Sequence, residues 1–272
     1  MTNSINSLIR TAFAASIILL ASITAGAQHK IAITAHRGFW KCEAAGNSEN
    51  SIASLREAQN AGLWGSEFDA HLTADNKILI NHDNTRGGKE IEQTKLRYFK
   101  SVQACRLKNG EWPSTLNQYL KQGKANDKTV LVYELKPEKY RSEDLLISKS
   151  VRSLKRHGLF DPSKVIFISF SKHMCDVIAQ KYPEFTNQYL NGDISPKDLK
   201  KDGINGLDYH FNVLKNHPEW VAEAHALGMS VNCWTVNKEE DIKAMIDLGV
   251  DCITTNEPLL VRKLLGDREL TL

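Results

Sequence analysis

Two short stretches of the sequence place reactive side chains directly after apolar residues. ITAHRGFW brings His36 and Arg37 to the end of an apolar run, and EFDAH carries Glu67 and Asp69 two positions apart. On a β-strand, residues two apart point to the same face, so these two carboxylates are expected to lie side by side. Because like charges repel, such a pair requires a cation or a proton between its members.

Two further stretches bring comparable side chains to predicted strand ends. YELK carries Glu134 and Lys136, and ILINHD supplies His82. Three carboxylates with no cysteine among them form an oxygen-ligand site, which suits Mg²⁺ or Ca²⁺ better than zinc. The simpler alternative is that the carboxylates only form salt bridges with neighbouring cations. The presence of Glu134 and two histidines favours a metal site made of Glu67, Asp69 and Glu134.

His36 and His82 are candidates for an acid–base pair. Neighbouring groups can separate the pKa values of two histidines, so that one imidazole accepts a proton while the other donates one. Arg37 and Lys136 add fixed positive charge. Cleavage of an anionic phosphoester requires such a set, because the phosphate must be neutralised, the attacking oxygen activated and the leaving oxygen protonated.

These side chains can act together only in a fold that brings the ends of several strands close to one another. Short runs of apolar and β-branched residues predict buried parallel strands, and helix-like segments with glycine stop signals lie between them. The predicted strands are Ile31–Ala35, Gly65–Asp69, Thr129–Glu134, Val165–Ser169, Thr186–Tyr189, Gly206–Tyr209, Ser230–Trp234 and Asp251–Thr255. Eight such alternations predict an α/β fold, a (β/α)₈ TIM barrel whose strand ends line the active-site mouth. An open doubly wound sheet is the alternative, and it is less favoured because no G-x-G-x-x-G follows the first strand.

Residues 84–126 separate the second and third predicted strands and are too long for a plain crossover. We interpret them as an insertion after the second strand that extends over one barrel face and ends in a helix from Ser114 to Gly123. No internal repeat or low-complexity stretch interrupts the alternation. Residues 28–272 are therefore predicted to form a single TIM-barrel domain.

The first 27 residues differ from the rest of the chain. Arg10 is their only charged side chain, an apolar run follows it, and the small residues Ala25 and Ala27 precede Gln28. This is the layout of a secretory signal peptide. A membrane anchor is disfavoured because the apolar run has about 12 residues and a bilayer span needs about 20. We predict an exported protein, periplasmic or secreted, that is cleaved near Ala27.

Composition and cysteine content narrow the function classes. The chain has 272 residues, of which 42% are hydrophobic and 25% charged, and its formal net charge of +3 is too small to indicate nucleic-acid binding. No segment after the N-terminal run is apolar enough for a stable membrane anchor. Five cysteines in an exported protein leave at least one thiol unpaired. A disulfide between Cys42 and Cys105 is left open.

The motifs, taken together, resemble the glycerophosphodiester phosphodiesterases, in their bacterial, exported form. The matching stretches are HRG, SEN, EFDAHLTADNKILINHD, YELK, WTVN and TTNEP, and they follow one another in the right order over nearly the whole mature chain. The combination of an upstream H-R-G with the E-x-D…T-x-D…H-D block is specific to this family.

The resemblance implies a metal-dependent enzyme that hydrolyses glycerophosphodiesters to glycerol 3-phosphate and an alcohol. By similarity, His36 is the general base, His82 the general acid, and the three carboxylates bind one divalent cation, Ca²⁺ or Mg²⁺. Arg37 and Lys136 would contact the phosphate. The attacking group would be the substrate's own 2-hydroxyl, giving a cyclic phosphate that water opens, and the insertion would help to shape the pocket.

The chain departs from the usual family pattern at four positions. Ser48 and Ser51 flank the Glu-Asn pair where proline and threonine are usual, Asn76 stands where a glycine is common, and Asn256 stands where an aspartate is usual. Ser48 is a good helix N-cap and Asn76 tolerates a left-handed turn. None of these changes removes a proposed catalytic group, so they bear on headgroup choice.

Four other residues are weaker candidates. Trp234 ends the seventh predicted strand and is expected to pack against the glycerol moiety, the alternative being a core tryptophan. Glu49, at a helix start, either orients Arg37 or touches the metal. His71 and Asp83 are expected to support their neighbours.

Two rival functions remain at this point. One is a phospholipase-D-like barrel enzyme that releases a cyclic phosphate from lysophospholipids, and the mostly polar insertion argues against it. The other is a non-catalytic binding barrel, which should have lost a histidine or a metal carboxylate. The sequence retains all of them.

Overall fold

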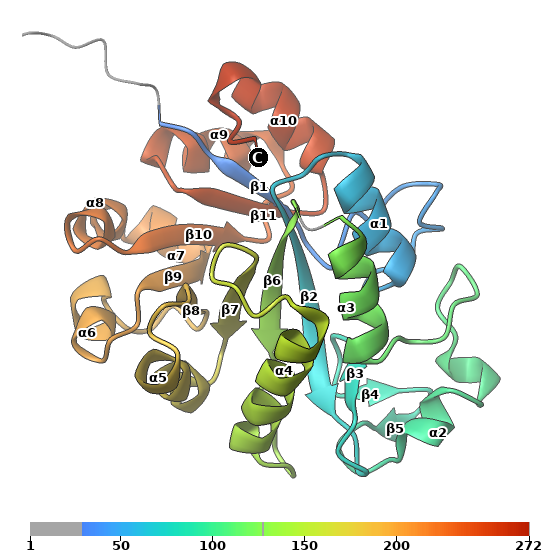
Figure 1. Cartoon of the computed structure of the whole chain (residues 1–272). Coiled ribbons are helices and arrows are strands. Elements are labelled where there is room, and N and C mark those ends of the chain that lie inside the picture. Colours follow the sequence, from blue (N-terminus) through green and yellow to red (C-terminus); the bar gives the residue numbers. More distant parts are fainter. Residues whose placement is uncertain (1–28, 127, 272) are drawn as a thin grey trace, which may run out of the picture.

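Eight parallel strands close into a barrel in the computed structural model, which describes residues 29–126 and 128–271 (Figure 1). The strands are β1 (Ala32–Ala35), β2 (Gly65–Leu72), β6 (Val130–Leu135), β7 (Val165–Ser169), β8 (Asn187–Tyr189), β9 (Gly206–His210), β10 (Ser230–Trp234) and β11 (Cys252–Thr255). Because β1 pairs in parallel with both β2 and β11, the ring is closed. The (β/α)₈ prediction is confirmed and an open doubly wound sheet is excluded.

Helices cover the outside of the barrel (Figure 1). They are α1 (Ile52–Asn60), α3 (Leu116–Ala125), α4 (Glu143–His157), α5 (Lys172–Lys181), α6 (Pro196–Lys201), α7 (Phe211–Asn216), α8 (Glu219–Ala226), α9 (Glu239–Leu248) and α10 (Pro258–Leu265). Capping boxes at Ser51 and Thr115 satisfy the first free amides of α1 and α3. Gly158 and Gly249 end α4 and α9 in the left-handed conformation, as their sequence positions predict.

Successive residues along each strand point alternately to the apolar core and to the interior of the barrel. On β9, Leu207 and Tyr209 pack in the apolar layer between strands and helices, whereas Asp208, between them, lines a cavity inside the barrel. Burial of the apolar layer fixes which residues face inward, because a shift of one residue would turn every side chain to the opposite face. The polar residues of the barrel interior are thus placed by the apolar residues beside them.

The insertion is more structured than the sequence indicates. A short strand, β3 (Ile78–Ile80), pairs antiparallel with β2, so β2 continues to Leu72, three residues beyond its predicted end. The hairpin of β4 (Thr85–Arg86) and β5 (Lys89–Glu90) follows, then α2 (Leu96–Phe99) and a 3₁₀ turn (Gln103–Cys105). The predicted helix is α3, shifted by two residues because Thr115 is its N-cap.

The five cysteines are all free thiols, so the alternative of a Cys42–Cys105 disulfide is wrong. The Cys42 thiol donates to the Phe39 carbonyl in the loop after β1. Cys105 is buried in a separate apolar cluster of the insertion, against Ile91 and Phe99. The two thiols therefore belong to different packed units.

Among the described residues, no helix has the length and apolar character required to cross a membrane. The predicted signal peptide, residues 1–27, lies outside the described part of the chain.

Candidate active site

The turn after β1 brings His36 and Arg37 to the barrel mouth. Arg37 and Gly38 both have positive φ, and a Cβ at Gly38 would overlap Ser54 at the start of α1. The Arg37 amide donates to Glu67 Oε2 at 2.7 Å, and the Ser54 hydroxyl donates to the Arg37 carbonyl at 3.0 Å. The turn is thus held by β2 on one side and by α1 on the other.

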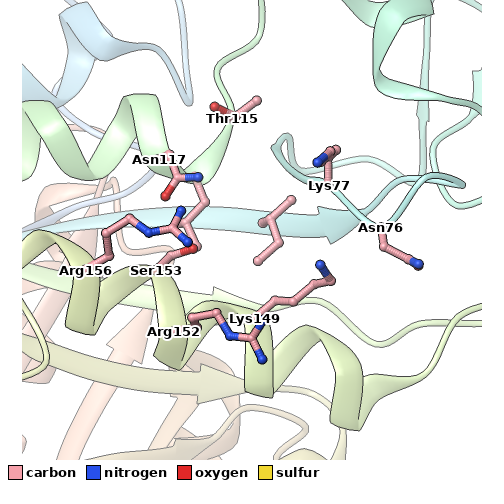
Figure 2. Close-up of a pocket in the computed structure, with 10 residues that line it drawn as sticks. Asn76, Lys77, Thr115, Asn117, Lys149, Arg152, Ser153 and Arg156 are labelled. Carbon is pink, nitrogen blue, oxygen red and sulfur yellow. The ribbon is translucent and has the colours of Figure 1, made fainter.

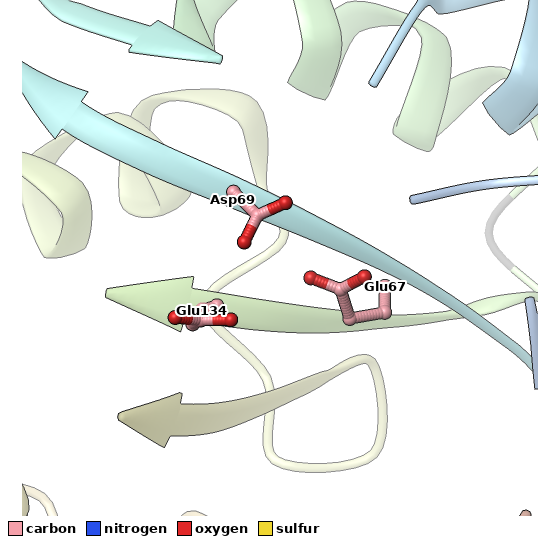
Figure 3. A group of neighbouring side chains, drawn as sticks. All are labelled: Glu67, Asp69 and Glu134. Carbon is pink, nitrogen blue, oxygen red and sulfur yellow. The ribbon is translucent and has the colours of Figure 1, made fainter. Parts of the chain in front are cut away.

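Three carboxylates converge on two neighbouring strands, β2 and β6 (Figure 3). Glu67 and Asp69 share one face of β2, and Asp69 lies in register with Glu134 on β6. One oxygen of each carboxylate lies within 4.8 Å of the others, and all three side chains are buried. The structure therefore brings together the three predicted metal ligands.

The charges around this cluster do not balance within the protein. Lys136 Nζ lies 2.8 Å from Glu134 Oε1 and 3.5 Å from Asp69 Oδ1, while Arg37 Nε lies 3.8 Å from Asp69 Oδ2. Salt bridges therefore form, as the simpler alternative predicts. Glu67 Oε1, however, is buried without a hydrogen-bond partner among the described residues. Three buried carboxylates facing two cations leave excess negative charge.

The pKa values of the carboxyl groups reflect this excess. Burial and the neighbouring carboxylates raise the pKa of Glu67 well above its usual value and that of Glu134 to about 8. Burial would also raise the pKa of Asp69, but Lys136 and the other nearby cations hold it below its ordinary range. A hard divalent cation would neutralise the excess negative charge of the buried carboxylates, because the ligands of such an ion are deprotonated oxygens. The residues present fit such an ion.

His36 is oriented by Asn256. Its Nδ1 lies 2.9 Å from Asn256 Oδ1, which also accepts the indole N–H of Trp40 at 3.1 Å. Since an indole N–H only donates, the acceptor must be the amide oxygen, and the His36 Nδ1 must then carry a hydrogen. Nε2 is left free to accept a proton. Burial, followed by the charge of Arg37, lowers the pKa of His36 to about 4, which keeps the ring neutral.

His82 lies beyond β3 and has a different environment. Its Nδ1 lies 2.8 Å from Asp83 Oδ1, and its side chain is 36% exposed. The His71 ring bonds to the His82 backbone carbonyl at 3.2 Å. His71 and Asp83 thus support His82, as the sequence predicts, and the two catalytic candidates differ in burial and in partner.

A cavity of about 220 Å³ joins the two histidines to the carboxylates. Its lining residues are His36, Arg37, Glu67, His82, Glu134, Ile168, Phe170, Leu190, Asp208, Trp234, Thr235 and Thr254. One wall is charged and comes from the loops and strands around β1, β2 and β6. The opposite wall is largely apolar. Trp234 stands on it, with its ring edge-to-face against Phe170 and His210.

Glu49 contacts Arg37 rather than the carboxylate cluster. Its Oε2 accepts from Arg37 Nη1 at 2.8 Å, and the side chain is 47% exposed. It is not among the three clustered carboxylates. Of the two roles weighed from the sequence, the geometry supports orientation of Arg37.

Two asparagines hold the site in ways that sequence reasoning missed. Asn50, at positive φ, donates to Asp69 Oδ2 at 2.8 Å and accepts from the Asp69 amide at 3.1 Å. Asn256 orients His36 as described above. The S-E-N motif and the unusual Asn256 were visible in the sequence, but the role of each depends on a partner far along the chain.

A second cavity of about 220 Å³ lies on the outer wall, between the start of α3 and α4 (Figure 2). Its charged lining consists of Lys77, Lys149, Arg152 and Arg156, without a carboxylate. It contains none of the catalytic candidates. The insertion lines a further cavity of about 210 Å³ with Arg86, Arg106, Leu107 and Lys108, and Glu49 also lines this cavity.

A closed (β/α)₈ barrel with histidines, carboxylates and cations at its C-terminal strand ends defines a TIM-barrel enzyme. The model of the glycerophosphoryl diester phosphodiesterase family matches residues 36–260. The chain belongs to this family, and it is a phosphodiesterase.

Relatives support this assignment. A crystal structure of a glycerophosphodiester phosphodiesterase from Parabacteroides distasonis is 40% identical, covers 89% of this chain and 99% of that one, and has a TM-score of 0.83. The glycerophosphodiester phosphodiesterase of Bacillus subtilis is 28% identical, with 86% of each chain covered. An Oleispira antarctica phosphodiesterase, solved with the product sn-glycerol-3-phosphate, shares the fold at 24% identity, 87% and 97% coverage, and a TM-score of 0.72.

Proposed function

We propose that this enzyme hydrolyses glycerophosphodiesters to glycerol 3-phosphate and an alcohol, with a divalent cation and with His36 and His82 as acid–base residues. One observation carries the proposal. A neutral imidazole with a free Nε2 shares a cavity with Arg37 and with Glu67 and Glu134, two of the three converging carboxylates, and Lys136 pairs with Glu134. The names of the relatives, and the product bound to one of them, support the choice of substrate.

The phosphate would lie at the charged wall of the cavity. Arg37 lines this wall and Lys136 stands beside two of the carboxylates, so both can neutralise a phosphate oxygen. Glu67, Asp69 and Glu134 would hold one Ca²⁺ or Mg²⁺, which supplies Lewis-acid stabilisation of the phosphoryl oxygens when it is bound. The protein side chains then position the substrate and move its protons.

His36 Nε2 would take the proton of the attacking 2-hydroxyl. A new bond forms between that oxygen and phosphorus, and the bond from phosphorus to the departing alcohol breaks. His82, held by Asp83, donates the proton that the departing oxygen needs. Water then attacks phosphorus and the bond from phosphorus to the 2-oxygen breaks; His82 takes a proton from the water and His36 returns its proton to the 2-oxygen, which gives glycerol 3-phosphate. The assignment follows from the environments of the two rings, because His36 is buried and neutral whereas His82 is partly exposed and lies beside a carboxylate.

A panel experiment tests the proposal. Mature protein supplied with Mg²⁺ or Ca²⁺ should release glycerol 3-phosphate from glycerophosphocholine and glycerophosphoethanolamine, with products identified by phosphorus NMR. A lysophospholipid should react much more slowly. Preferential release of cyclic phosphate from the lysophospholipid would favour the phospholipase alternative, and no turnover with any of these diesters would favour the binding barrel.

We also propose that the protein is exported and begins at or near Gln28 after cleavage. The support is the charge-poor apolar run and the small residues Ala25 and Ala27. N-terminal sequencing of exported protein should find this start, and an intact Met1 would refute it.

A further inference from the structure

Asp208 is a buried carboxyl group in the substrate cavity for which the proposed mechanism has no use. It lies on β9, is 1% exposed, and lines the same cavity as His36 and Arg37. Its Oδ1 has no hydrogen-bond partner among the described residues, and the Trp234 indole donates only to its backbone oxygen, at 2.8 Å. A buried polar atom without a partner is costly. Because Asp208 lines the cavity, a ligand bound there would complete the bonding of this carboxyl group.

The surroundings of Asp208 favour the neutral form of its carboxyl group. Burial raises the pKa of this carboxyl well above its usual value, and the Asn232 side chain offsets the effect only in part. No cation offsets it among the residues that the structure describes. A protonated carboxyl has an O–H donor as well as acceptor oxygens, which matches the bonding of an alcohol hydroxyl. It also lies outside the carboxylate cluster at the opposite wall.

The two walls of the cavity set the direction of the substrate. A phosphate held by Arg37 and the carboxylate site leaves the glycerol carbons along the apolar wall, against Trp234 and Leu190. The 2-hydroxyl must face His36 to react. The terminal hydroxyl of the glycerol then lies on the side of the cavity where Asp208 stands.

We propose that Asp208 is a specificity-determining residue that bonds the terminal hydroxyl of the glycerol moiety. The enzyme then selects phosphodiesters in which that hydroxyl is free, and it discriminates against those in which it is missing or acylated. This inference rests on the proposed hydrolysis of glycerophosphodiesters and adds a reason for the choice of substrate.

Two esters with the same leaving group test the inference. Glyceryl p-nitrophenyl phosphate has both hydroxyls, whereas 2-hydroxypropyl p-nitrophenyl phosphate keeps the attacking hydroxyl and lacks the terminal one. The native enzyme should prefer the first by about ten- to hundredfold in kcat/KM, because the second leaves the buried carboxyl unpaired. Asp208→Leu has a similar size and no hydrogen-bonding group, so its preference should fall to about twofold or less. Asp208→Asn retains a donor and should keep a clear preference.

Stability separates this role from a structural one. Asp208→Leu removes a buried carboxyl whose Oδ1 has no hydrogen-bond partner among the described residues, so its melting temperature should stay close to that of the native protein. Thr129→Val is a control for the loss of a buried hydroxyl, since the Thr129 hydroxyl bonds the Leu63 carbonyl and Thr129 does not line the cavity. It should leave the ratio between the two esters unchanged.

Each contrary outcome has a distinct meaning. Equal rates of the native enzyme with both esters, an unchanged ratio in Asp208→Leu, or a large loss of stability in that variant would each overturn the inference while the hydrolytic function stands. Failure of the metal-loaded native enzyme to turn over either ester would instead contradict the proposed function.

Discussion

The Asn256 side chain determines which ring nitrogen of His36 carries the hydrogen. The amide oxygen takes the Nδ1 hydrogen and leaves Nε2 free, yet an uncharged amide stabilises the imidazolium far less than a carboxylate would. Burial and the charge of Arg37 lower the His36 pKa to about 4, and the Asn256 amide offsets them only in part. As the proposed general base, His36 would stay neutral in mildly acidic solution and would become protonated, and therefore inactive, only near and below pH values of about 4.

Asn256→Asp should therefore shift the acid limb of the pH profile. The carboxylate raises the His36 pKa, so kcat/KM at saturating metal should begin to fall at a higher pH than in the native enzyme. Asn237→Asp is the control, because Asn237 contacts the Asn256 backbone amide and not the His36 ring. If the acid limb stays in place in Asn256→Asp, or moves equally in both variants, the assigned contact does not govern the base.

The two histidines should respond differently to the leaving group. His36→Ala and His82→Ala should each lose about 10²–10⁴-fold in kcat with ordinary alcohol leaving groups while remaining folded. With p-nitrophenol, which needs little protonation, His82→Ala should recover much of its rate and His36→Ala should not. Steady-state rates with both substrate types decide the matter. Equal recovery of both variants, or of neither, would mean that the roles are wrongly assigned.

At the residue scale, the sequence predicts the groups that sit on strand ends. Glu67, Asp69 and Glu134 converge because strand periodicity and barrel register fix them. Asn50, Asn256 and Asp208 are not predictable in the same way. Their importance comes from contacts with single atoms across the barrel, and a lone polar residue in a sequence does not reveal whether its partner is solvent, backbone or substrate.

The turn after β1 and helix α1 act as one positioning element. The Ser54 hydroxyl belongs to the α1 capping box and also bonds the Arg37 carbonyl, while Gly38 packs directly against Ser54. The helix start and the catalytic turn therefore cannot move independently.

Gly38→Ala should disrupt this element. The new methyl group overlaps Ser54 and the residue must also adopt positive φ, so we expect a loss of more than about 1 kcal/mol in the free energy of unfolding and a large loss of kcat. Gly88→Ala is the control, because Gly88 also has positive φ but nothing lies within 4 Å of its added Cβ. Urea unfolding and steady-state kinetics measure both effects. An active Gly38→Ala enzyme would show that the turn does not need this close packing.

At the element scale, the alternation of strands and helices was predictable because parallel barrel strands are short and apolar. Even the weakly patterned β8 and β9 were placed correctly, since the barrel requires a strand at that spacing. The extension of β2 and the added strand β3 were not, because a three-residue apolar run has no periodicity of its own.

For the whole molecule, the structure predicts five free thiols in a protein proposed to be exported. Cys42 is half-buried and the other four cysteines are buried. Protein prepared without reductant should therefore show one readily reactive thiol when folded and five after unfolding, measured with Ellman's reagent. Cys42→Ser should abolish the fast reaction and leave four. A total of three thiols in the native sequence would reveal a disulfide that the fold does not contain.

In the proposed mechanism the barrel holds three carboxylates and two histidines around one phosphate, and metal dependence tests this proposal most directly. Protein stripped with EDTA and transferred to metal-free buffer should lose turnover of glycerophosphocholine and regain it on addition of Mg²⁺ or Ca²⁺. Asp69→Asn should need a much higher metal concentration for the same recovery, because it removes one anionic ligand from the cluster. Undiminished turnover by the stripped native protein, with residual metal shown to be absent by elemental analysis, would contradict the account.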